Sequence, residues 1–311
     1  MEMNRPNFMV IGAGKSGTTT LYHWLQEHPE VFLTPIKETN YFALKNTTWP
    51  IGPDPDQMHN FPDAITQEKD YISQYENRSS KHKAAGEVCP MYLYHPKAAK
   101  NIKAFNPATK LIVILRQPAE RLYSRHMHLT RENRALSFGN IFDKESLWWK
   151  RNDLIKEGFY YKHLKFYFKV FRADQILVLL YEDLVNDNVA LIKSVYTHIG
   201  VNPDFQPTLD NIFNKSGKVN NQLIDRFIGQ NSIAKKYLKA ILPFVFEKIR
   251  SNHSARQLIT NLRNRNLHKI PPQKGLLENI TNSVYSKDIT QLQKLIQRDL
   301  SHWFNLTPTI K

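Results

Sequence analysis

One stretch near the start of the chain has the residue types of a loop that binds a phosphate group. It reads FMVIGAGKSGTTT from Phe8 to Thr20: a short apolar run, a glycine-spaced turn with one lysine, and then hydroxyl residues. A helical pattern follows, so the turn is expected at a helix start, where backbone N–H groups and the helix dipole favour a bound anion. The stretch therefore predicts a strand, a phosphate-binding loop and a helix.

Arg116 and Ser124 form a second candidate anion site. Arg116 directly follows the clearest buried-strand pattern, 110–115, and Ser124 lies two turns into the next predicted helix. Both side chains are therefore expected to face one phosphate group, whose oxygens the fork of an arginine binds in pairs. A nucleotide with separated 5′ and 3′ phosphates, handled without a metal ion, fits the two candidate sites.

The glycines alone also match a dinucleotide-binding fingerprint. Residues 12–17, GAGKSG, fit G-x-G-x-x-G, and Glu38 follows at about the distance of the acid that binds a ribose. That acid should end the second strand, whereas Glu38 lies beyond Pro35 in a predicted loop. The lysine inside the fingerprint is also unusual, because the motif works through close approach of bare backbone.

A kinase or NTPase loop is a further interpretation. Residues 14–16, GKS, resemble the end of such a loop, but its first glycine would fall at position 9, which is Met9. These enzymes also need an acid after a buried strand to hold Mg²⁺. The best buried strand ends at Arg116, a cation that repels a metal ion and attracts a second phosphate.

Strand and helix patterns alternate along the chain, which predicts an α/β fold with a P-loop-like parallel sheet covered by helices on both faces. Ligands bind at the carboxyl ends of the strands in such sheets, so Glu38, Glu87, Arg116, Tyr181 and the glycine turn are expected along one rim. Strands are predicted at 8–11, 31–33, 84–88, 110–115 and 176–180. Helices are predicted at 18–27, 63–77, 96–105, 119–134, 138–151, 160–171 and 287–303. A further helix is predicted to follow residues 181–184 and to end at 198.

Composition limits the class of protein. Cys89 is the only cysteine of the 311 residues, which excludes a disulfide framework and a thiolate metal site. No apolar run approaches the ~18–20 residues of a membrane span, and the first residues do not resemble a signal peptide, so we expect a cytoplasmic protein. We predict one domain over 1–311, with a core of about 1–210, a basic helical acceptor or cap region at 211–286, and a C-terminal helix at 287–311 that packs on the core.

Much of the net charge of +15 comes from the stretch 211–275, where thirteen Lys or Arg residues stand against two acids. A basic surface attracts polyanions, anionic membranes or acidic substrates. A non-enzymatic polyanion-binding protein is therefore another interpretation, as is a simple solvated surface. Residues 232–250 mix lysines with apolar residues and suit peripheral contact with an anionic membrane, or a helix pair over an acceptor cleft. No nucleic-acid-binding motif is present, so no nucleic-acid partner is expected.

Taken together, the motifs resemble sulfotransferases that use 3′-phosphoadenosine 5′-phosphosulfate (PAPS), and most of all the branch with heparan sulfate sulfotransferases and their bacterial relatives. Residues 15–19, KSGTT, resemble the 5′-phosphosulfate loop, and 115–124, LRQPAERLYS, resemble the 3′-phosphate motif L-R-x-P-x-x-R-x-x-S. Residues 37–42, KETNYF, resemble the loop with a catalytic glutamate. Residues 86–92, GEVCPMY, and 181–184, YEDL, resemble two further family segments.

The resemblance implies a role for each matched residue. Lys15 is expected to stabilise charge on the leaving phosphate oxygen, Glu38 to take the proton from the acceptor as general base, and Glu87 to orient the acceptor or tune that base. His126 stays open as an alternative base. The expected nucleotide contacts are Lys15, Ser16, Gly17, Thr18, Thr19, Arg116, Ser124, Tyr181 (at the adenine), Lys215 and Lys218, with no metal ligand.

Structural roles stay open for the same side chains. Glu38 can pair with Lys37, Arg116 can pair with Glu120 or Asp183, and Tyr181 can serve as a packing aromatic. The acceptor also stays open among a sugar hydroxyl, an amino sugar, a phenol or other small molecule, and a lipid headgroup. A carbohydrate or glycolipid is favoured by the resemblance, and no oligomeric state is predicted.

Overall fold

The computed structural model describes residues 5–47, 64–131, 134, 136–209, 218–219, 267–268 and 270–305. The chain divides into two compact units, one made of 1–123, 137–213 and 273–311 and the other of 124–136 and 214–272. The first unit contains a five-stranded sheet. In the second unit, a short antiparallel pair joins β6 (Lys218–Val219) and β7 (Leu267–His268).

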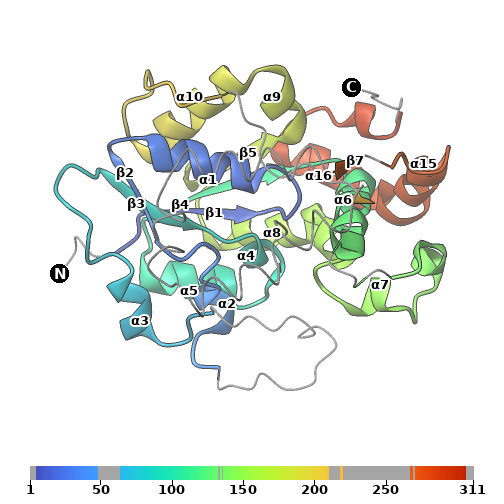
Figure 1. The fold of residues 1–311 in the computed structure, drawn as a ribbon, viewed down its shortest axis with the longest axis horizontal. Helices are drawn as coiled ribbons and strands as arrows, with labels where there is room; N and C mark the ends of the chain where they lie inside the picture. The colour runs from blue at the N-terminus through green and yellow to red at the C-terminus, as the bar shows by residue number, and fades with distance from the viewer. Residues whose placement is uncertain are drawn as a thin grey trace. The chain divides into compact units, whose positions relative to one another are not determined.

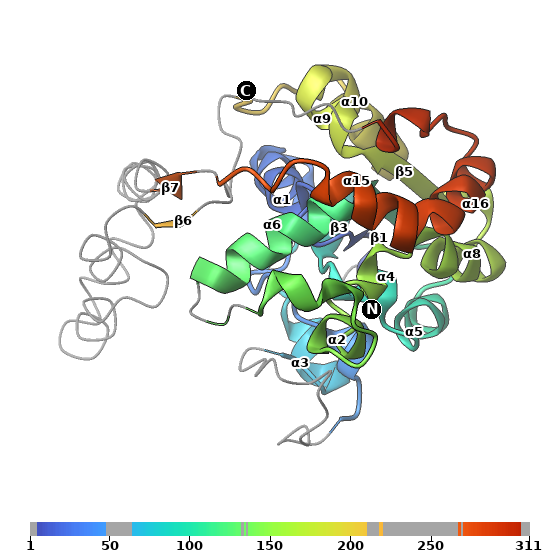
Figure 2. The ribbon, with the colours of Figure 1, turned by 90° about the vertical axis from the view of Figure 1, so that its right-hand side faces the viewer.

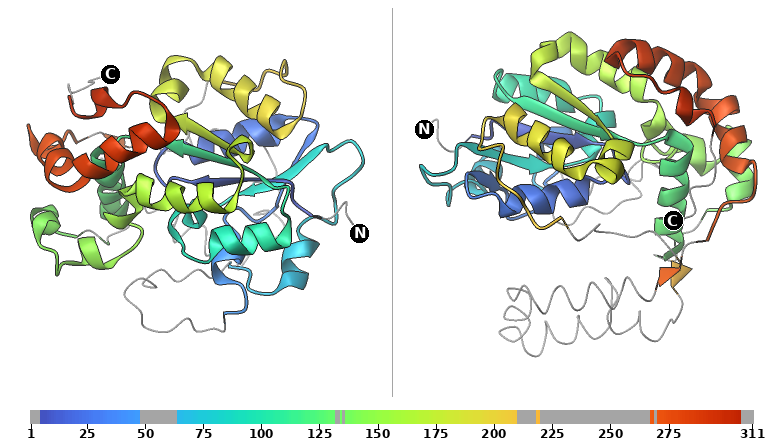
Figure 3. Two further views of the ribbon diagram at one scale, coloured as in Figure 1. Left: turned by 180° about the vertical axis from the view of Figure 1, so that it is seen from behind. Right: turned by 90° about the horizontal axis from the view of Figure 1, so that it is seen from above.

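The sheet of the first unit is parallel throughout, with the strand order β2-β3-β1-β4-β5. Its strands are β1 (Phe8–Gly12), β2 (Val31–Leu33), β3 (Ala84–Val88), β4 (Lys110–Leu115) and β5 (Ile176–Leu180). One face packs against α1 (Thr18–Glu27), α9 (Tyr181–Asn186) and α10 (Asn188–Ile199) (Figures 1 and 3). The other face packs against α4 (Met91–Tyr94), α5 (Ala98–Phe105) and α8 (Tyr160–Val170) (Figures 1 and 3). The α/β fold with helices on both faces is confirmed.

The described residues contain further helices and turns. They are α2 (Tyr41–Leu44), α3 (Glu68–Ser73), α6 (Pro118–Arg131), α7 (Leu147–Lys150), α15 (Leu276–Ile280) and α16 (Ser286–Ile296), with a π-helical turn at Thr281–Tyr285 and 3-10 turns at Phe138–Phe142, Lys156–Gly158, Ala173–Gln175 and Ser301–Trp303. α16 packs beside α8 (Figure 2). Asp288 of α16 accepts the backbone N–H groups of Tyr161 and Lys162 at 2.9 Å and 3.3 Å, and so caps the start of α8.

The core lies on both sides of β1, whose five residues are all buried. Apolar side chains of β1 and β4 point to both faces, which is the pattern that a doubly covered parallel sheet requires. On the side of α1 and α10 the core includes Val10, Leu21, Trp24, Ile112, Ile114, Leu191 and Val195. Gly86 of β3 lies so close to β1 that an added Cβ would overlap the backbone oxygen of Phe8.

Most predicted strands and the first helix have the expected bounds, but one predicted helix does not exist. Residues 138–151 form a 3-10 turn and the short α7 instead of one helix. Asp143 interrupts the pattern, because its side chain accepts the N–H of Glu145 and its carbonyl accepts the hydroxyl of Ser146. Such local bonds offer the backbone an alternative to helix.

The predicted C-terminal helix is also too long. It ends at Ile296, and Gln297 takes a left-handed conformation with φ 53°. Leu300 and Trp303 are buried after this turn instead of continuing the stripe of the helix. The helix predicted at 63–77 is shortened to α3, and the predicted loop that contains Glu38 ends where α2 begins at Tyr41.

Most of the basic stretch 211–275 lies outside the described residues, and the division into a core and a cap stays a prediction. Within the described ranges no helix is long and apolar enough to span a membrane.

We expect Gly86→Ala to destabilise the protein by about 3 kcal/mol, because a methyl group has no space between β3 and β1. Chemical denaturation measures the loss. Gly139→Ala is the matched control, since the nearest atom to its added Cβ is Ser137 Oγ at 3.7 Å. Equal stability of the two variants would contradict the close approach of these strands.

Candidate functional site

The predicted site residues of the first unit lie at the carboxyl ends of neighbouring strands. The glycine turn follows β1, Arg116 follows β4, and Tyr181 follows β5. Glu87 is the last residue but one of β3, where it pairs with Met9 of β1. Because the strands are parallel, all of these positions share one rim of the sheet.

The loop after β1 has the backbone of an anion-binding turn. Lys15 has φ 67° and Gly17 has φ 99°, both left-handed, and Gly17 is the N-cap of α1. No side chain caps α1, and no acidic residue lies in its first turn. The first-turn N–H groups and the positive end of the helix dipole therefore suit a phosphate group, and Thr18 and Thr19 stand in that turn. The residues present fit the predicted 5′-phosphosulfate loop.

A carboxylate that the sequence did not reveal holds the start of this loop. The backbone N–H of Gly14 donates to Glu157 Oε1 at 2.6 Å. Glu157 Oε2 lies 2.8 Å from Arg121 Nη1, and both side chains are almost completely buried. The two contacts join positions far apart in the chain, so no local spacing could have indicated Glu157. Arg121 was visible only as part of the LRQPAERLYS motif.

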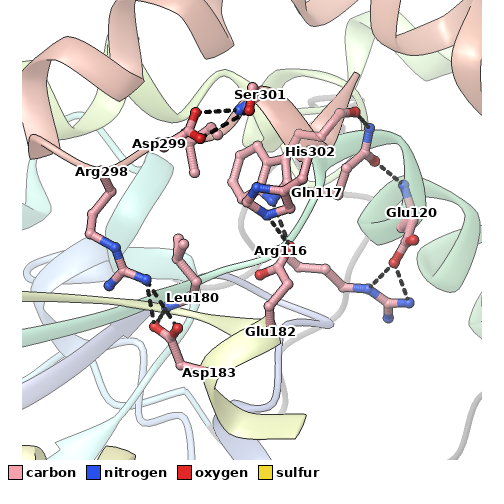
Figure 4. Close-up of polar contacts among 12 residues, drawn as sticks. Arg116, Gln117, Glu120, Leu180, Glu182, Asp183, Arg298, Asp299, Ser301 and His302 are labelled. Atoms are coloured by element: carbon pink, nitrogen blue, oxygen red, sulfur yellow. Dashed lines mark hydrogen bonds and ion pairs between the residues drawn. The ribbon is translucent and has the colours of Figure 1, made fainter. Parts of the chain in front are cut away.

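Arg116 is held on three sides. Its guanidinium forms a two-bond ion pair with Glu120, with Nε and Nη2 at 3.0 Å and 2.9 Å from Oε2 (Figure 4). The guanidinium carbon lies 4.6 Å from the centre of the Tyr181 ring, a cation–π contact. The backbone oxygen of Arg116 accepts the hydroxyl of Tyr160 at 2.9 Å. The pairing with Glu120 was one of the open structural roles.

Tyr181 also borders the phosphate loop. A Cβ added to Gly17 would lie 3.6 Å from Tyr181 Cδ2 and 2.8 Å from Leu184 Cδ2, so the loop needs a residue without a side chain there. The loop that contains Lys15 and the guanidinium of Arg116 thus both lie beside the ring of Tyr181. This neighbourhood, from the loop across Tyr181 to Arg116, is called the two-anion rim below.

The C-terminal segment of the first unit lies beside Arg116 and the two acids that follow Tyr181 (Figure 4). Trp303 Nε1 donates to Glu182 Oε1 at 2.5 Å, and Arg298 pairs with Asp183 at 3.0 Å. Gln117, directly after Arg116, donates to the Trp303 carbonyl at 3.1 Å. The acids of the YEDL motif therefore hold this segment in place.

Glu38 lies on an exposed loop with unusual backbone geometry. Its side chain is 46% exposed and lies 2.6 Å from Lys37 Nζ. Glu38 and Asn40 both have left-handed φ angles, 62° and 58°, which are uncommon for residues with a side chain. Thr39 between them is buried, so the loop is fixed by its middle residue while the carboxylate of Glu38 faces outward.

Glu87 is fully buried and fixes that middle residue. Its carboxylate accepts three hydroxyl groups: Thr39 at 2.6 Å, Tyr71 at 2.8 Å and Tyr92 at 2.9 Å. Burial raises the pKa of Glu87, and the three hydrogen bonds act in the opposite direction. The geometry links Glu87 to the Glu38 loop through Thr39.

Contacts of the other predicted residues with the nucleotide stay predictions. Ser124 is buried in α6, where the second unit begins, and His126 lies in the same helix with a pKa lowered by burial. Lys218 begins β6 of the second unit, and Lys215 lies outside the described residues. No group of three or more metal-binding side chains occurs among the residues that are described.

The buried carboxylate of Glu87 predicts a pH dependence of stability. Because its pKa is raised above the ordinary 4.5, the folded state binds the proton more tightly than the unfolded state. The free energy of unfolding of the wild type, relative to Glu87→Gln, should therefore fall as the pH rises above about 4.5.

Glu68 provides a control of opposite sign. The hydrogen bond from Lys45 lowers its pKa, so the wild type should gain stability relative to Glu68→Gln as the pH rises toward 4.5. Urea denaturation at several pH values measures both differences. If the two stability differences changed with pH in the same direction, the opposite pKa shifts of Glu87 and Glu68 would be contradicted.

Comparison with known proteins gives the family. A sequence profile described as "Sulfotransferase family" matches residues 6–206. "Membrane-associated sulfotransferase kil1" of Dictyostelium discoideum is 34% identical over 121 residues, which are 39% of this chain and 22% of that protein. "Bifunctional heparan sulfate N-deacetylase/N-sulfotransferase 4" of Mus musculus is 25% identical over 214 residues, with 64% and 23% covered. This chain thus spans under a quarter of either relative.

A solved structure shares the fold. The crystal structure of a sulfotransferase from Alicyclobacillus acidocaldarius matches with a TM-score of 0.68 at 24% identity, and the match covers 96% of this chain and 98% of that one. The profile match extends over more than half of the chain and includes β1 to β5, the phosphate loop and Arg116. The chain belongs to the sulfotransferase family.

Proposed function

We propose that the chain transfers a sulfuryl group from PAPS to a hydroxyl or amine of an acceptor. The observation that carries the proposal is the two-anion rim, where an uncapped helix start with Lys15 and the guanidinium of Arg116 border the same tyrosine. Two cationic groups at separate strand ends suit a nucleotide with 5′ and 3′ phosphates. The cation after β4 does not suit the Mg²⁺ that a kinase needs.

In the proposed reaction, an oxygen or nitrogen of the acceptor forms a bond to sulfur as the bond from sulfur to the 5′-phosphate oxygen breaks. The transition state resembles that of phosphoryl transfer, so positioning and charge stabilisation supply most of the rate. Lys15 stabilises the negative charge on the leaving oxygen, and Thr18 and Thr19 with the start of α1 hold the 5′ group. Glu38 accepts the proton that the acceptor loses.

Arg116 binds the 3′-phosphate, and to do so it must exchange or share its bonds with Glu120. The Arg116–Glu120 pair is partly exposed, with side chains 23% and 30% accessible. Exposed pairs contribute little to stability, so a dianionic phosphate can compete with the carboxylate. Tyr181 contacts the adenine beside the phosphate, and its cation–π contact with Arg116 supports this role.

The exposure of Glu38 supports its role as general base. Its carboxylate is accessible to an acceptor from solvent, while its loop is anchored through Thr39 to the buried Glu87. Glu87 is too deeply buried to contact an acceptor, so we assign it the positioning of Glu38 rather than the chemistry itself. The heparan sulfate relative favours a carbohydrate acceptor, with a glycolipid or another small molecule as the next classes to test.

Arg116→Ala tests the donor site. We expect binding of 3′-phosphoadenosine 5′-phosphate (PAP) in EDTA to weaken roughly tenfold to a hundredfold, the range for losing charge-assisted hydrogen bonds. Isothermal titration calorimetry measures the change. Arg172→Ala is the control, because Arg172 also pairs with a nearby acid, Asp174, but lies before the amino end of β5. PAP binding that depends on Mg²⁺ or ignores Arg116 would argue for a kinase or for general polyanion binding.

Glu38→Gln tests the base. We expect kcat for transfer of labelled sulfate from PAPS to fall ~10²–10⁴-fold with PAP affinity unchanged, because the substitution removes proton transfer and not nucleotide binding. The acceptor panel contains unsulfated glycosaminoglycans, amino-sugar polymers, glycolipids and phenols. Glu76→Gln, at an exposed acid outside the site, is the control. Full activity of Glu38→Gln on the best acceptor would remove Glu38 from the mechanism.

A further inference from the structure

One short stretch, 153–160, contacts both halves of the two-anion rim. Glu157 accepts the N–H of Gly14, which begins the phosphate loop. Three residues later, the Tyr160 hydroxyl donates to the backbone oxygen of Arg116. The two proposed phosphate sites, which follow different strands, are thus bonded to side chains three residues apart.

The stretch is itself held firmly. Arg121, with no exposed side-chain surface, pairs with Glu157 and also donates to the backbone oxygens of Asp153 and Leu154. The Tyr285 hydroxyl donates to the Ile155 carbonyl at 3.0 Å. These bonds tie the side chain of Glu157 to the backbone at 153–155, shortly before Tyr160 begins α8.

The two glycines beside Glu157 are also closely packed. A Cβ added to Gly158 would lie 2.8 Å from the Tyr285 ring, and one added to Gly14 would lie 2.9 Å from Glu157 Oε1. Both glycines permit a close approach that a larger residue would prevent. The path from Gly14 through Glu157 and Tyr160 to Arg116 is therefore continuous and tightly packed.

The buried ion pair is better explained by positioning than by stability. Burying two charges costs desolvation energy that offsets most of their attraction, whereas removing one partner leaves a costly unpaired charge. The net effect is to fix geometry. The N–H of Gly14 is committed to Glu157, so an anion in the loop must be held by the groups that follow it.

We propose that Glu157 and Tyr160 are positioning residues that set the separation between the 5′-phosphosulfate loop and Arg116. The protein then selects nucleotides that carry phosphates at both the 5′ and 3′ positions. Once one phosphate is bound, the other meets a site already at the right distance, which raises its effective concentration and lowers the cost of ordering. The proposal rests on the proposed function, because it concerns binding of the same nucleotide.

Calorimetry with four ligands tests the selection: PAP, adenosine 5′-phosphate, adenosine 3′-phosphate and adenosine. Each adenosine monophosphate gains binding free energy over adenosine from its one phosphate. In the wild type we expect PAP to bind more tightly than the sum of these two gains predicts. Tyr160→Phe keeps the packed ring and removes the hydroxyl, which donates to the Arg116 backbone oxygen and also contacts the Ser16 side chain. It should weaken PAP and adenosine 3′-phosphate roughly threefold to tenfold and weaken adenosine 5′-phosphate by a smaller factor.

Tyr167→Phe is the matched control for Tyr160. Tyr167 lies on the same helix, is equally buried, and donates its hydroxyl to the backbone oxygen of Tyr92 at 2.6 Å, but it contacts neither anion site. It should lower the melting temperature as Tyr160→Phe does while keeping the ratio of PAP to adenosine 5′-phosphate affinity at the wild-type value.

A double variant that removes both buried charges tests the role of Glu157. Glu157→Gln alone leaves Arg121 buried without a counter-charge, so Arg121→Met is added to keep the interior neutral. The double variant also loses the bonds from Arg121 to the backbone oxygens of Asp153 and Leu154, so the stretch 153–160 is held less firmly. PAP should therefore weaken by a larger factor than either adenosine 5′-phosphate or adenosine 3′-phosphate alone. Should it fail to fold, Tyr160→Phe still decides the proposal.

The outcomes separate the two claims. If the wild type does not bind PAP, the proposed function fails. If the wild type binds PAP tightly but Tyr160→Phe and Tyr167→Phe show the same ratio of PAP to adenosine 5′-phosphate affinity, the positioning role is overturned and the proposed function stands.

Discussion

The parallel pairing of β1 with β3 on one side and β4 on the other is the constraint on which the site depends. It aligns the carboxyl ends of three strands, so that the phosphate loop, Glu87 and Arg116 follow one another along a single rim. The close approach at Gly86 allows the β1 and β3 backbones to keep this register. Without the alignment, each of these residues would be an isolated polar group at the end of a strand.

Three glutamates near this rim differ in function because their surroundings differ. Glu157 is buried against a guanidinium and orders backbone, while Glu87 is buried against hydroxyl groups and orders the loop of Glu38. Glu38 is exposed, which is why we propose it as the general base in place of the other two. Burial and partner type, rather than residue type, therefore decide which carboxylate is available for chemistry.

The sequence predicted the fold and the strand-end residues because both depend on local patterns. The apolar run at β4 and the glycine turn after β1 can be recognised from neighbouring residues alone. Glu157 and Tyr160 were missed as site residues, because their importance comes from contacts with Gly14 and Arg116 that no short spacing encodes. The helix predicted at 138–151 failed for a local reason, the turn-forming bonds of Asp143.

The first compact unit is discontinuous along the chain, since 124–136 and 214–272 interrupt it before residues 273–311 return to complete it. Residues 273–311 supply Trp303 and Arg298, which bond to Glu182 and Asp183 directly after Tyr181. These two bonds join positions 115 and 121 residues apart along the chain. The segment after β5 therefore gains these partners only when residues 273–305 pack on the rest of the first unit, so its final geometry depends on contacts that span the whole insertion.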